Sequence, residues 1–114
     1  MLVTKVCYNV LQRKSAMRLI REPLHWDDAN EDHLWTAHRV TPDEVEELLF
    51  ERDGFVPKTL VVRDGDYYVI FGETLGGRYL KLVGSLLQNG RFRVFGARDM
   101  EPAEKRRYRK GLGN

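Results

Sequence analysis

Hydrophobic and polar residues alternate with a period of two from Phe55 onward, a pattern typical of β-strands. Three dipeptides interrupt the alternation at regular intervals: Asp64-Gly65, Gly76-Gly77 and Asn89-Gly90. Such dipeptides tolerate the positive φ angles that tight hairpins need. The pattern therefore predicts a four-stranded antiparallel meander, with strands over residues 57–63, 66–73, 78–87 and 91–97.

Before the meander, apolar positions follow helical spacing. Asp27 or Asp28 can cap a helix whose broad stripe contains Asn30, His33, Leu34, Ala37 and His38. A second helix opens at Thr41, which can accept from the early amides while Glu44 reaches back to the cap residue. Pro42 suits the first helical position because its missing N–H costs nothing there. A final helix is predicted to begin near Pro102 and to end before Gly111.

The first residues fit no single pattern. Val3, Val6, Cys7, Val10 and Leu11 have helical spacing, but the β-branched content weakens a helical interpretation. We interpret residues 1–16 as an N-terminal extension, with Met17 as a candidate natural start and 17–21 as a short strand. Residues 17–110 then form a single domain, and 111–114 form a tail.

The predicted fold is α+β, with two N-terminal helices packed on one face of the four-stranded antiparallel meander and a short C-terminal helix. The other face of the sheet is left partly open, and we expect a ligand there. Because strand side chains alternate, Arg98 is predicted to share a face with Phe92 and Val94. An arginine would then point along the packed side of the sheet.

The composition is that of a globular protein of 114 residues, 42% hydrophobic and 32% charged. No apolar run is long enough to span a membrane, and the first 22 residues lack the apolar centre of a signal peptide, so the cytoplasm is the predicted location. The single cysteine, Cys7, agrees with a reducing compartment.

The net charge of +2 conceals a strong polarity along the chain. Residues 27–53 hold ten acidic and two basic residues, a net charge of −8, whereas 91–114 hold eight basic and three acidic residues, a net charge of +5. A basic end favours nucleic acid, but it also attracts an acidic protein partner. Charge alone does not separate these two kinds of partner.

Three blocks of sequence occur in order over residues 24–109. They are Trp26-Asp27 through Asn30 to His38-Arg39-Val40-Thr41-Pro42-Asp43-Glu44-Val45-Glu46-Glu47; Tyr67-Tyr68-Val69-Ile70-Phe71-Gly72-Glu73-Thr74 with Gly77-Arg78-Tyr79-Leu80; and Arg93-Val94-Phe95-Gly96-Ala97-Arg98 with Glu104, Arg107 and Tyr108. In these blocks the chain resembles the BrnT-type toxins of bacterial toxin–antitoxin systems, which are related to the RelE-like ribonuclease toxins. The resemblance implies a RelE-like fold, RNA cleavage that arrests translation, and neutralisation by a BrnA-type antitoxin that carries a DNA-binding module.

The chain departs from the family pattern at both helix ends near the blocks. The family usually has His-Gly-Val after the first helix, and this chain has Arg39 in place of the glycine. The first helix must therefore end without glycine's easy left-handed conformation. Before the last helix a capping threonine is common, and Glu101 here is a poorer cap.

RNA can be cleaved without a metal when its 2′-hydroxyl attacks the neighbouring phosphorus while cations stabilise the developing charge. Arginine suits the cationic role because its planar fork binds phosphate oxygens in pairs. Arg98 and Arg107 are the first candidates, and Arg78 is the next. The alternative for Arg98 is an ion pair with Glu104 or Glu73 that ties the sheet to the last helix.

The acid and the base have several candidates. His33 and His38 titrate in a suitable range, but each shares a helix stripe with apolar residues, which favours a packed core histidine. Tyr68 and Tyr108 can donate a proton or stack on a base, although packing is the commoner role. Glu73 can act as a base if it is desolvated, or it can balance Arg78 or Arg98. Candidate RNA-binding residues are Arg91, Arg93, Lys105, Arg106 and Tyr68.

We therefore predict a toxin that cuts single-stranded RNA without a metal or another cofactor, with RNA and a BrnA-type antitoxin as partners and no membrane association. Its complex with the antitoxin can bind operator DNA through the antitoxin. Trp26 and Trp35 are predicted to be core residues or antitoxin-facing anchors. The alternative is a non-catalytic module of the same scaffold that binds a protein or nucleic acid through its basic C-terminal strand and helix.

Overall fold

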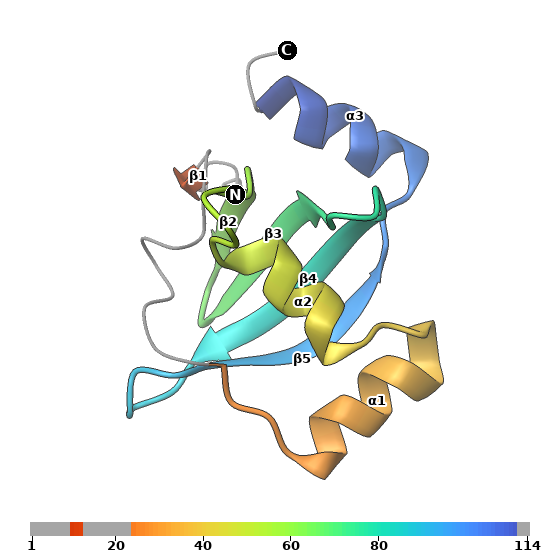
Figure 1. Ribbon diagram of the computed structural model, residues 1–114. Helices are drawn as coiled ribbons and strands as arrows, with labels where there is room; N and C mark the ends of the chain where they lie inside the picture. The colour runs from red at the N-terminus through yellow and green to blue at the C-terminus, as the bar shows by residue number, and fades with distance from the viewer. Residues whose placement is uncertain (1–9, 13–23, 112–114) are drawn as a thin grey trace.

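The computed structural model describes residues 10–12 and 24–111 of the chain (Figure 1). Along the sequence the elements are β1 (Val10–Gln12), α1 (Asp28–His38), α2 (Pro42–Leu49), β2 (Leu60–Asp64), β3 (Tyr67–Glu73), β4 (Tyr79–Leu86), β5 (Phe92–Asp99) and α3 (Pro102–Gly111). The α+β class is confirmed. No helix in the described ranges is long and apolar enough to cross a membrane.

The strands form one antiparallel sheet in the order β1-β2-β3-β4-β5. The predicted meander is β2 to β5, and its turns contain Gly65, Gly77 and Gly90 with positive φ. β1 adds a fifth strand because Val10 pairs with Val62 of β2, so the helical spacing of the first residues is misleading at this point. The short strand predicted at 17–21 lies outside the described residues.

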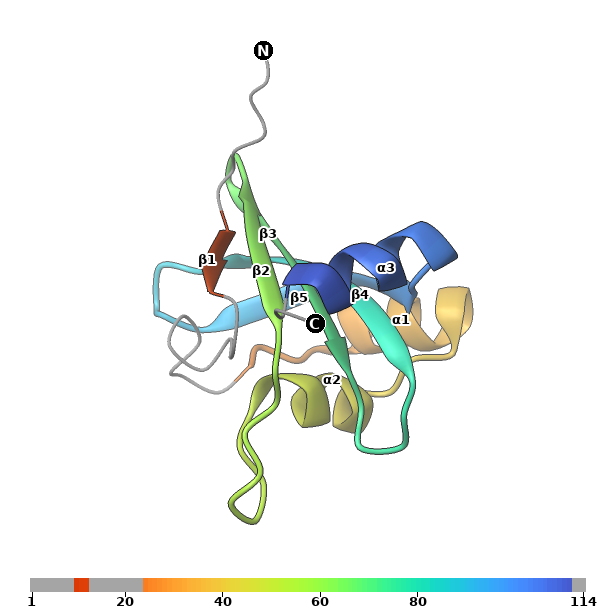
Figure 2. The same cartoon turned by 90° about the horizontal axis from the view of Figure 1, so that it is seen from above.

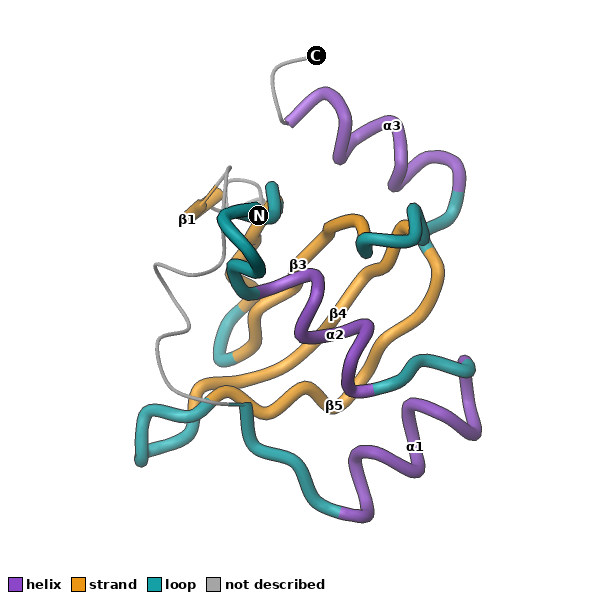
Figure 3. The backbone as a smooth tube through the Cα atoms, viewed as in Figure 1, coloured by secondary structure: helices purple, strands orange, loops and turns teal. Residues whose placement is uncertain are grey.

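Both predicted N-terminal caps are present. Asp27 accepts from the Asn30 amide at 2.9 Å, and the Asp27 amide donates to the Asn30 side chain at 2.8 Å. Thr41 and Glu44 form the same reciprocal pair at the start of α2. The connection between α1 and α2 is short (Figure 3), and α1 ends at Arg39 with a φ of 56°. A left-handed residue that is not glycine costs free energy, so surrounding contacts must hold it.

Helices lie on both faces of the sheet (Figure 2), and each face carries a hydrophobic core. α1 and α2 cover one face. The core between these helices and the sheet includes Leu34, Val45, Leu48, Val61, Ile70, Leu80, Leu82, Phe92, Val94 and Ala97. α3 lies on the opposite face over Leu60, Val62, Phe71, Met100 and its own Tyr108. The face predicted to be open is therefore partly covered by the last helix.

A β-bulge interrupts the pairing of β4 with β5. Val83 pairs with Gly96 and Gly84 pairs with Val94, which leaves Phe95 without a partner. The extra residue reverses the alternation of faces beyond it. Ala97 therefore joins Phe92 and Val94 in the core under α1, and Arg98 lies on the other face, opposite Lys81 and beside α3. The prediction that Arg98 shares a face with Phe92 and Val94 is wrong for this reason.

Gly84 is required where the bulge brings the strands together. A Cβ atom at this position would lie 2.5 Å from the carbonyl oxygen of Arg93 and 2.7 Å from the ring of Phe92. At Gly96, its neighbour across the bulge, the nearest atom to a Cβ would be 3.9 Å away, in Val83. An added methyl group would therefore clash with neighbouring atoms at Gly84 and make only ordinary van der Waals contact at Gly96.

We expect Gly84→Ala to lower the free energy of unfolding by about 1–3 kcal/mol or more, because the clash is with backbone that cannot rotate away. Gly96→Ala is the matched control and should change it by less than about 1 kcal/mol. Urea denaturation of both variants measures the difference. Equal losses would contradict the close approach at Gly84.

Candidate functional site

A groove of about 240 Å³ runs beside α3 on the face of the sheet opposite α1 and α2. Its floor is apolar and its charged rim comes from β2, β4 and α3; the lining residues are Val62, Asp64, Val69, Phe71, Lys81, Glu104 and Arg107. We call this the α3 groove. Val69 and Phe71 of β3 and Lys81 of β4 are brought together because every second residue of a strand faces the same side.

Arg98 and Glu104 form a two-pronged ion pair beside the α3 groove. The Arg98 Nη1 and Nη2 atoms each donate to a Glu104 carboxylate oxygen at 2.8 Å. Lys81 Nζ lies 3.5 Å from the same carboxylate, and the Glu101 amide donates to it at 2.9 Å. The bonds from Arg98 hold the pKa of Glu104 at about 2, and the pair raises the pKa of Arg98. Arg98 thus ties the sheet to α3, as the ion-pair alternative predicted.

Arg107 is the cation of the α3 groove that no other residue in the described part of the chain binds. Its side chain is exposed, and among the described residues it forms no hydrogen bond or ion pair. Lys81, Arg98 and Arg107 reach this region from β4, β5 and α3 respectively. Sequence reasoning chose Arg98 and Arg107 but missed Lys81, whose place opposite Arg98 depends on the β4–β5 register.

An exposed tyrosine, Tyr67, and a half-buried phenylalanine, Phe95, form an aromatic pair on the same face of the sheet. The rings of Tyr67 and Phe95 meet edge to face with their centroids 5.3 Å apart, and Tyr67 is 52% exposed. Tyr68 was the predicted stacking residue, but it is 8% exposed and packs on Phe92 in the core under α1. Of the two roles considered for Tyr68, packing is therefore the one that its burial supports, and the alternation places Tyr67 on the accessible face.

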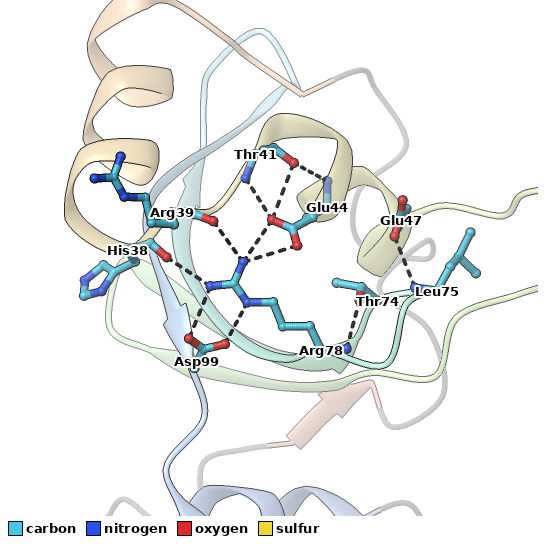
Figure 4. A network of polar contacts seen from close by, with 9 residues as sticks. All are labelled: His38, Arg39, Thr41, Glu44, Glu47, Thr74, Leu75, Arg78 and Asp99. Carbon is cyan, nitrogen blue, oxygen red and sulfur yellow. Dashed lines mark hydrogen bonds and ion pairs between the residues drawn. The ribbon is translucent and has the colours of Figure 1, made fainter.

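Arg78 lies outside the α3 groove, at the centre of a network that joins α1, α2 and β5 (Figure 4). Every nitrogen of its guanidinium donates. Nε and Nη2 reach the Asp99 carboxylate at 2.7 and 3.2 Å, and Nη1 reaches Glu44 at 3.0 Å. Nη1 and Nη2 also donate to the carbonyl oxygens of Arg39 and His38, at 2.9 and 3.0 Å.

The Arg78 network explains how α1 ends at Arg39 without glycine, since a cation binds the last carbonyl oxygens of the helix. The bond with Asp99 raises the pKa of Arg78, and the same bond lowers the pKa of Asp99. All N–H groups of the Arg78 guanidinium are thus used, and none is left to bind a phosphate. The structure therefore does not support the catalytic role predicted for Arg78 and gives it a structural one.

The histidines do not approach the cations of the α3 groove. His33 and His38 are exposed on α1, across the sheet from Arg98, so the prediction that they are core histidines is wrong. His25 bonds to Asp27, which also pairs with Arg93 at 3.4 Å. Trp26 is half-buried and donates to Glu46, whereas Trp35 is 49% exposed with Arg39 stacked on it. No histidine is among the residues that line the α3 groove.

A second cavity, of about 560 Å³, lies on the other side of α3. It brings together Glu73 and Tyr108, two of the predicted catalytic residues, with Phe55, Lys58, Tyr79 and Arg109. We call this the Glu73 cavity. The Tyr108 hydroxyl donates to the Lys58 carbonyl at 2.8 Å, and burial raises the Tyr108 pKa to about 12. Tyr108 is therefore a weak acid that is already engaged, which argues against the predicted proton transfer.

The remaining basic residues predicted to bind RNA are spread over β5 and α3. Lys105 lies over the Tyr79 ring at 5.3 Å, Arg106 is exposed, and Arg91 is half-buried immediately before β5. Arg109 was not predicted, although it lies four residues after Lys105 and covers the same ring at 5.3 Å. The described residues hold no group of three or more histidine, cysteine, aspartate and glutamate side chains placed to bind a metal ion.

Comparison with known proteins adds no relative. No family model, no curated protein and no solved structure matches this chain. The resemblance to BrnT-type toxins thus depends on the three sequence blocks alone.

We expect Arg78→Ala to lower the free energy of unfolding by about 2–3 kcal/mol, because it leaves Glu44 and two helix-end carbonyl oxygens without their donor. The exposed Arg52, whose side chain forms no hydrogen bond or ion pair within the described residues, provides the control. Arg52→Ala should change stability by no more than about 0.5 kcal/mol. Thermal and urea denaturation measure both, and equal effects would exclude a structural role for Arg78.

The Arg98–Glu104 pair predicts a dependence of stability on pH. The pKa of Glu104 is about 2 in the folded chain against an ordinary value of 4.5, so the pair stabilises fully above pH 4.5 and is lost as the pH falls toward 2. Glu104→Gln should be less stable at neutral pH and should lose less stability over that range. Denaturation midpoints measured from pH 7 to 2 test this, and parallel curves for the two proteins would contradict it.

Proposed function

We propose that this chain is a BrnT-type toxin of RelE-like fold, an endoribonuclease that cuts single-stranded RNA without a metal. The observation that carries the proposal is the approach of Lys81 and Arg98 to one carboxylate, Glu104, beside the α3 groove, which Arg107 also lines. A cluster of cations around one potential base is the minimum that metal-free RNA cleavage requires. The three sequence blocks supply the independent support.

Arg107 makes the first contact with the scissile phosphate in this proposal, because no group within residues 10–12 and 24–111 competes for it. Arg98 is next, since its fork fits two phosphate oxygens as well as it fits the Glu104 carboxylate. When a phosphate replaces Glu104 as the partner of Arg98, the guanidinium of Arg98 still donates two hydrogen bonds. Phosphate binding therefore releases Glu104 from the bonds that hold its pKa at about 2.

The released Glu104 then acts as the general base. It takes the proton of the 2′-hydroxyl, the 2′-oxygen attacks phosphorus, and the bond from phosphorus to the 5′-oxygen breaks. Lys81 donates a proton to the leaving 5′-oxygen, which gives a 2′,3′-cyclic phosphate and a 5′-hydroxyl. Lys81 and Glu104 lie 3.5 Å apart, so a proton can pass back between them and restore both groups.

Tyr67 and Phe95 supply the stacking surface for a neighbouring base. They lie on the same face of the sheet as Val69 and Lys81, within one or two strand positions of the α3 groove. An aromatic ring binds bases of any sequence by stacking, which suits a single-stranded substrate. This assigns to Tyr67 the role that the sequence suggested for Tyr68.

The proposed partner is a BrnA-type antitoxin that covers the α3 groove and blocks access of RNA to Arg107. The antitoxin's DNA-binding module would connect the complex to operator DNA. Trp35 offers a second anchor for a protein partner, because it is a large, half-exposed aromatic residue on α1.

A non-catalytic binding module is the second candidate. It is favoured by the lack of a histidine among the lining residues of the α3 groove and by the engagement of Glu104 in an ion pair. In that case the same cations bind an anionic partner and no bond is broken. The two functions differ in whether RNA is cleaved when it is bound.

Arg107→Ala tests the proposed function most cleanly, because Arg107 has no structural contact among the described residues and the fold should persist. We expect it to lower the cleavage rate of a single-stranded RNA by about 10²-fold or more. Arg106→Ala removes the same charge from the next position outside the α3 groove and should only weaken binding a few-fold. Single-turnover and binding assays separate these effects. RNA that the wild type binds and leaves intact would favour the binding module.

A further inference from the structure

The Glu73 cavity is not used by the cleavage chemistry proposed above, yet it has the features of a ligand site. Its volume of about 560 Å³ falls in the range of about 300–1,000 Å³ usual for small-molecule sites. Aromatic surface comes from Phe55, Tyr79 and Tyr108, and polar groups come from Glu73, Lys58 and Arg109. The two tyrosine rings meet edge to face with centroids 6.0 Å apart, which fixes the wall they form.

Glu73 is the anionic group of this cavity, and its side chain is exposed. It lies at the end of β3, and its carboxylate accepts no hydrogen bond from the described part of the chain. The Tyr108 hydroxyl donates to the backbone carbonyl of Lys58, and Arg109 donates to the Tyr79 hydroxyl at 3.4 Å. The exposed ammonium of Lys58 has no hydrogen-bond partner among the described residues. A ligand for this cavity therefore needs hydrogen-bond donors that face a carboxylate.

We propose that the Glu73 cavity binds a guanine base, an inference that rests on the RNA-cleaving function proposed above. Guanine presents two adjacent N–H donors on its Watson–Crick edge, which match the two oxygens of one carboxylate. Adenine and cytosine present a single amino group there, and uracil flanks its one donor with carbonyl oxygens that repel a carboxylate. Phe55 and the guanidinium of Arg109, which lies over the Tyr79 ring, supply flat surfaces for stacking.

The position of the cavity allows one RNA strand to reach it and the α3 groove together. Phe71 lines the α3 groove and Glu73 lines the cavity, two residues apart on the same face of β3, which is roughly 7 Å along the strand. α3 stands between the two sites, and its exposed surface carries Arg106, Arg107, Arg109 and Lys110. An RNA strand that crosses α3 therefore passes over positively charged side chains between the two sites.

The test is a titration of the full chain with GMP, AMP, CMP and UMP. NMR monitors binding through the ring protons of Tyr79 and Tyr108 and the amide of Gly77, which lies beside Glu73. We expect GMP to bind roughly tenfold or more tighter than the other nucleotides, because a two-pronged pair gives about that discrimination. Glu73→Gln should remove the preference. Glu31→Gln, on α1 across the sheet, makes the same charge change and should keep it. Equal binding of all four nucleotides, or a preference that survives in Glu73→Gln, would overturn the proposal.

Cleavage of a mixed-sequence RNA identifies the source of the guanine. If the wild type cuts at a fixed distance from guanine and Glu73→Gln cuts without regard to guanine, a base of the substrate occupies the cavity. Selective GMP binding with cuts that ignore guanine assigns the cavity to a free guanine nucleotide. Selective GMP binding without any cleavage would support the cavity and reject the ribonuclease, whereas cleavage without selective GMP binding would do the reverse.

Discussion

The β-bulge at Phe95 is the constraint on which the proposed site depends. Without the extra residue, strict alternation would direct Arg98 into the core beneath α1, where a charge is costly. With it, Ala97 fills that core position and Arg98 faces α3, where Glu104 and Lys81 complete a charged cluster. Gly84 makes the bulge possible, because no side chain fits between it and the carbonyl oxygen of Arg93. A local irregularity of the backbone thus decides which face of the sheet carries chemistry.

The two arginine clusters differ in how completely their hydrogen bonds are used. Arg78 donates from every nitrogen to groups of the fold, and two of its acceptors are backbone carbonyl oxygens that cannot move away. Arg98 donates from both Nη atoms to one side chain, Glu104, and to a single backbone oxygen, that of Asp99, at 2.9 Å. Arg107 forms no hydrogen bond within the described residues. An incoming phosphate can replace a side-chain partner but not a set of backbone partners. This difference separates a structural arginine from a candidate catalytic one.

Local signals in the sequence predict much of the fold. The turn glycines at 65, 77 and 90 define the hairpins because only positive φ closes them tightly, and the caps at Asp27 and Thr41 act within four residues. Properties that depend on distant contacts were not predictable. Period two could not separate Tyr67 from Tyr68, because the strand is apolar on both faces where helices cover both sides of the sheet.

The site was predictable only as a list of residue types. Arg98, Arg107 and Glu104 were recognised from their density of charge, but their contact with Lys81 follows from the register of β4 against β5. Arg78 has the same chemistry as Arg98 in the sequence, and only the neighbouring helix ends distinguish them. On the predicted stripe of α1, Asn30 and Leu34 are buried, whereas His33, Ala37 and His38 are exposed.

The central claim is that RNA binds on the α3 face of the sheet with a phosphate among Lys81, Arg98 and Arg107. The most direct measurement is an NMR titration with a short single-stranded RNA made uncleavable by a 2′-deoxy residue at the cut. The account predicts shifts at Tyr67, Lys81, Arg98 and Arg107, with α1 and α2 unchanged. Chemical-shift changes confined to α1 and α2 would contradict it. So would the absence of any change with the uncleavable RNA, if the protein cuts the cleavable form of the same RNA.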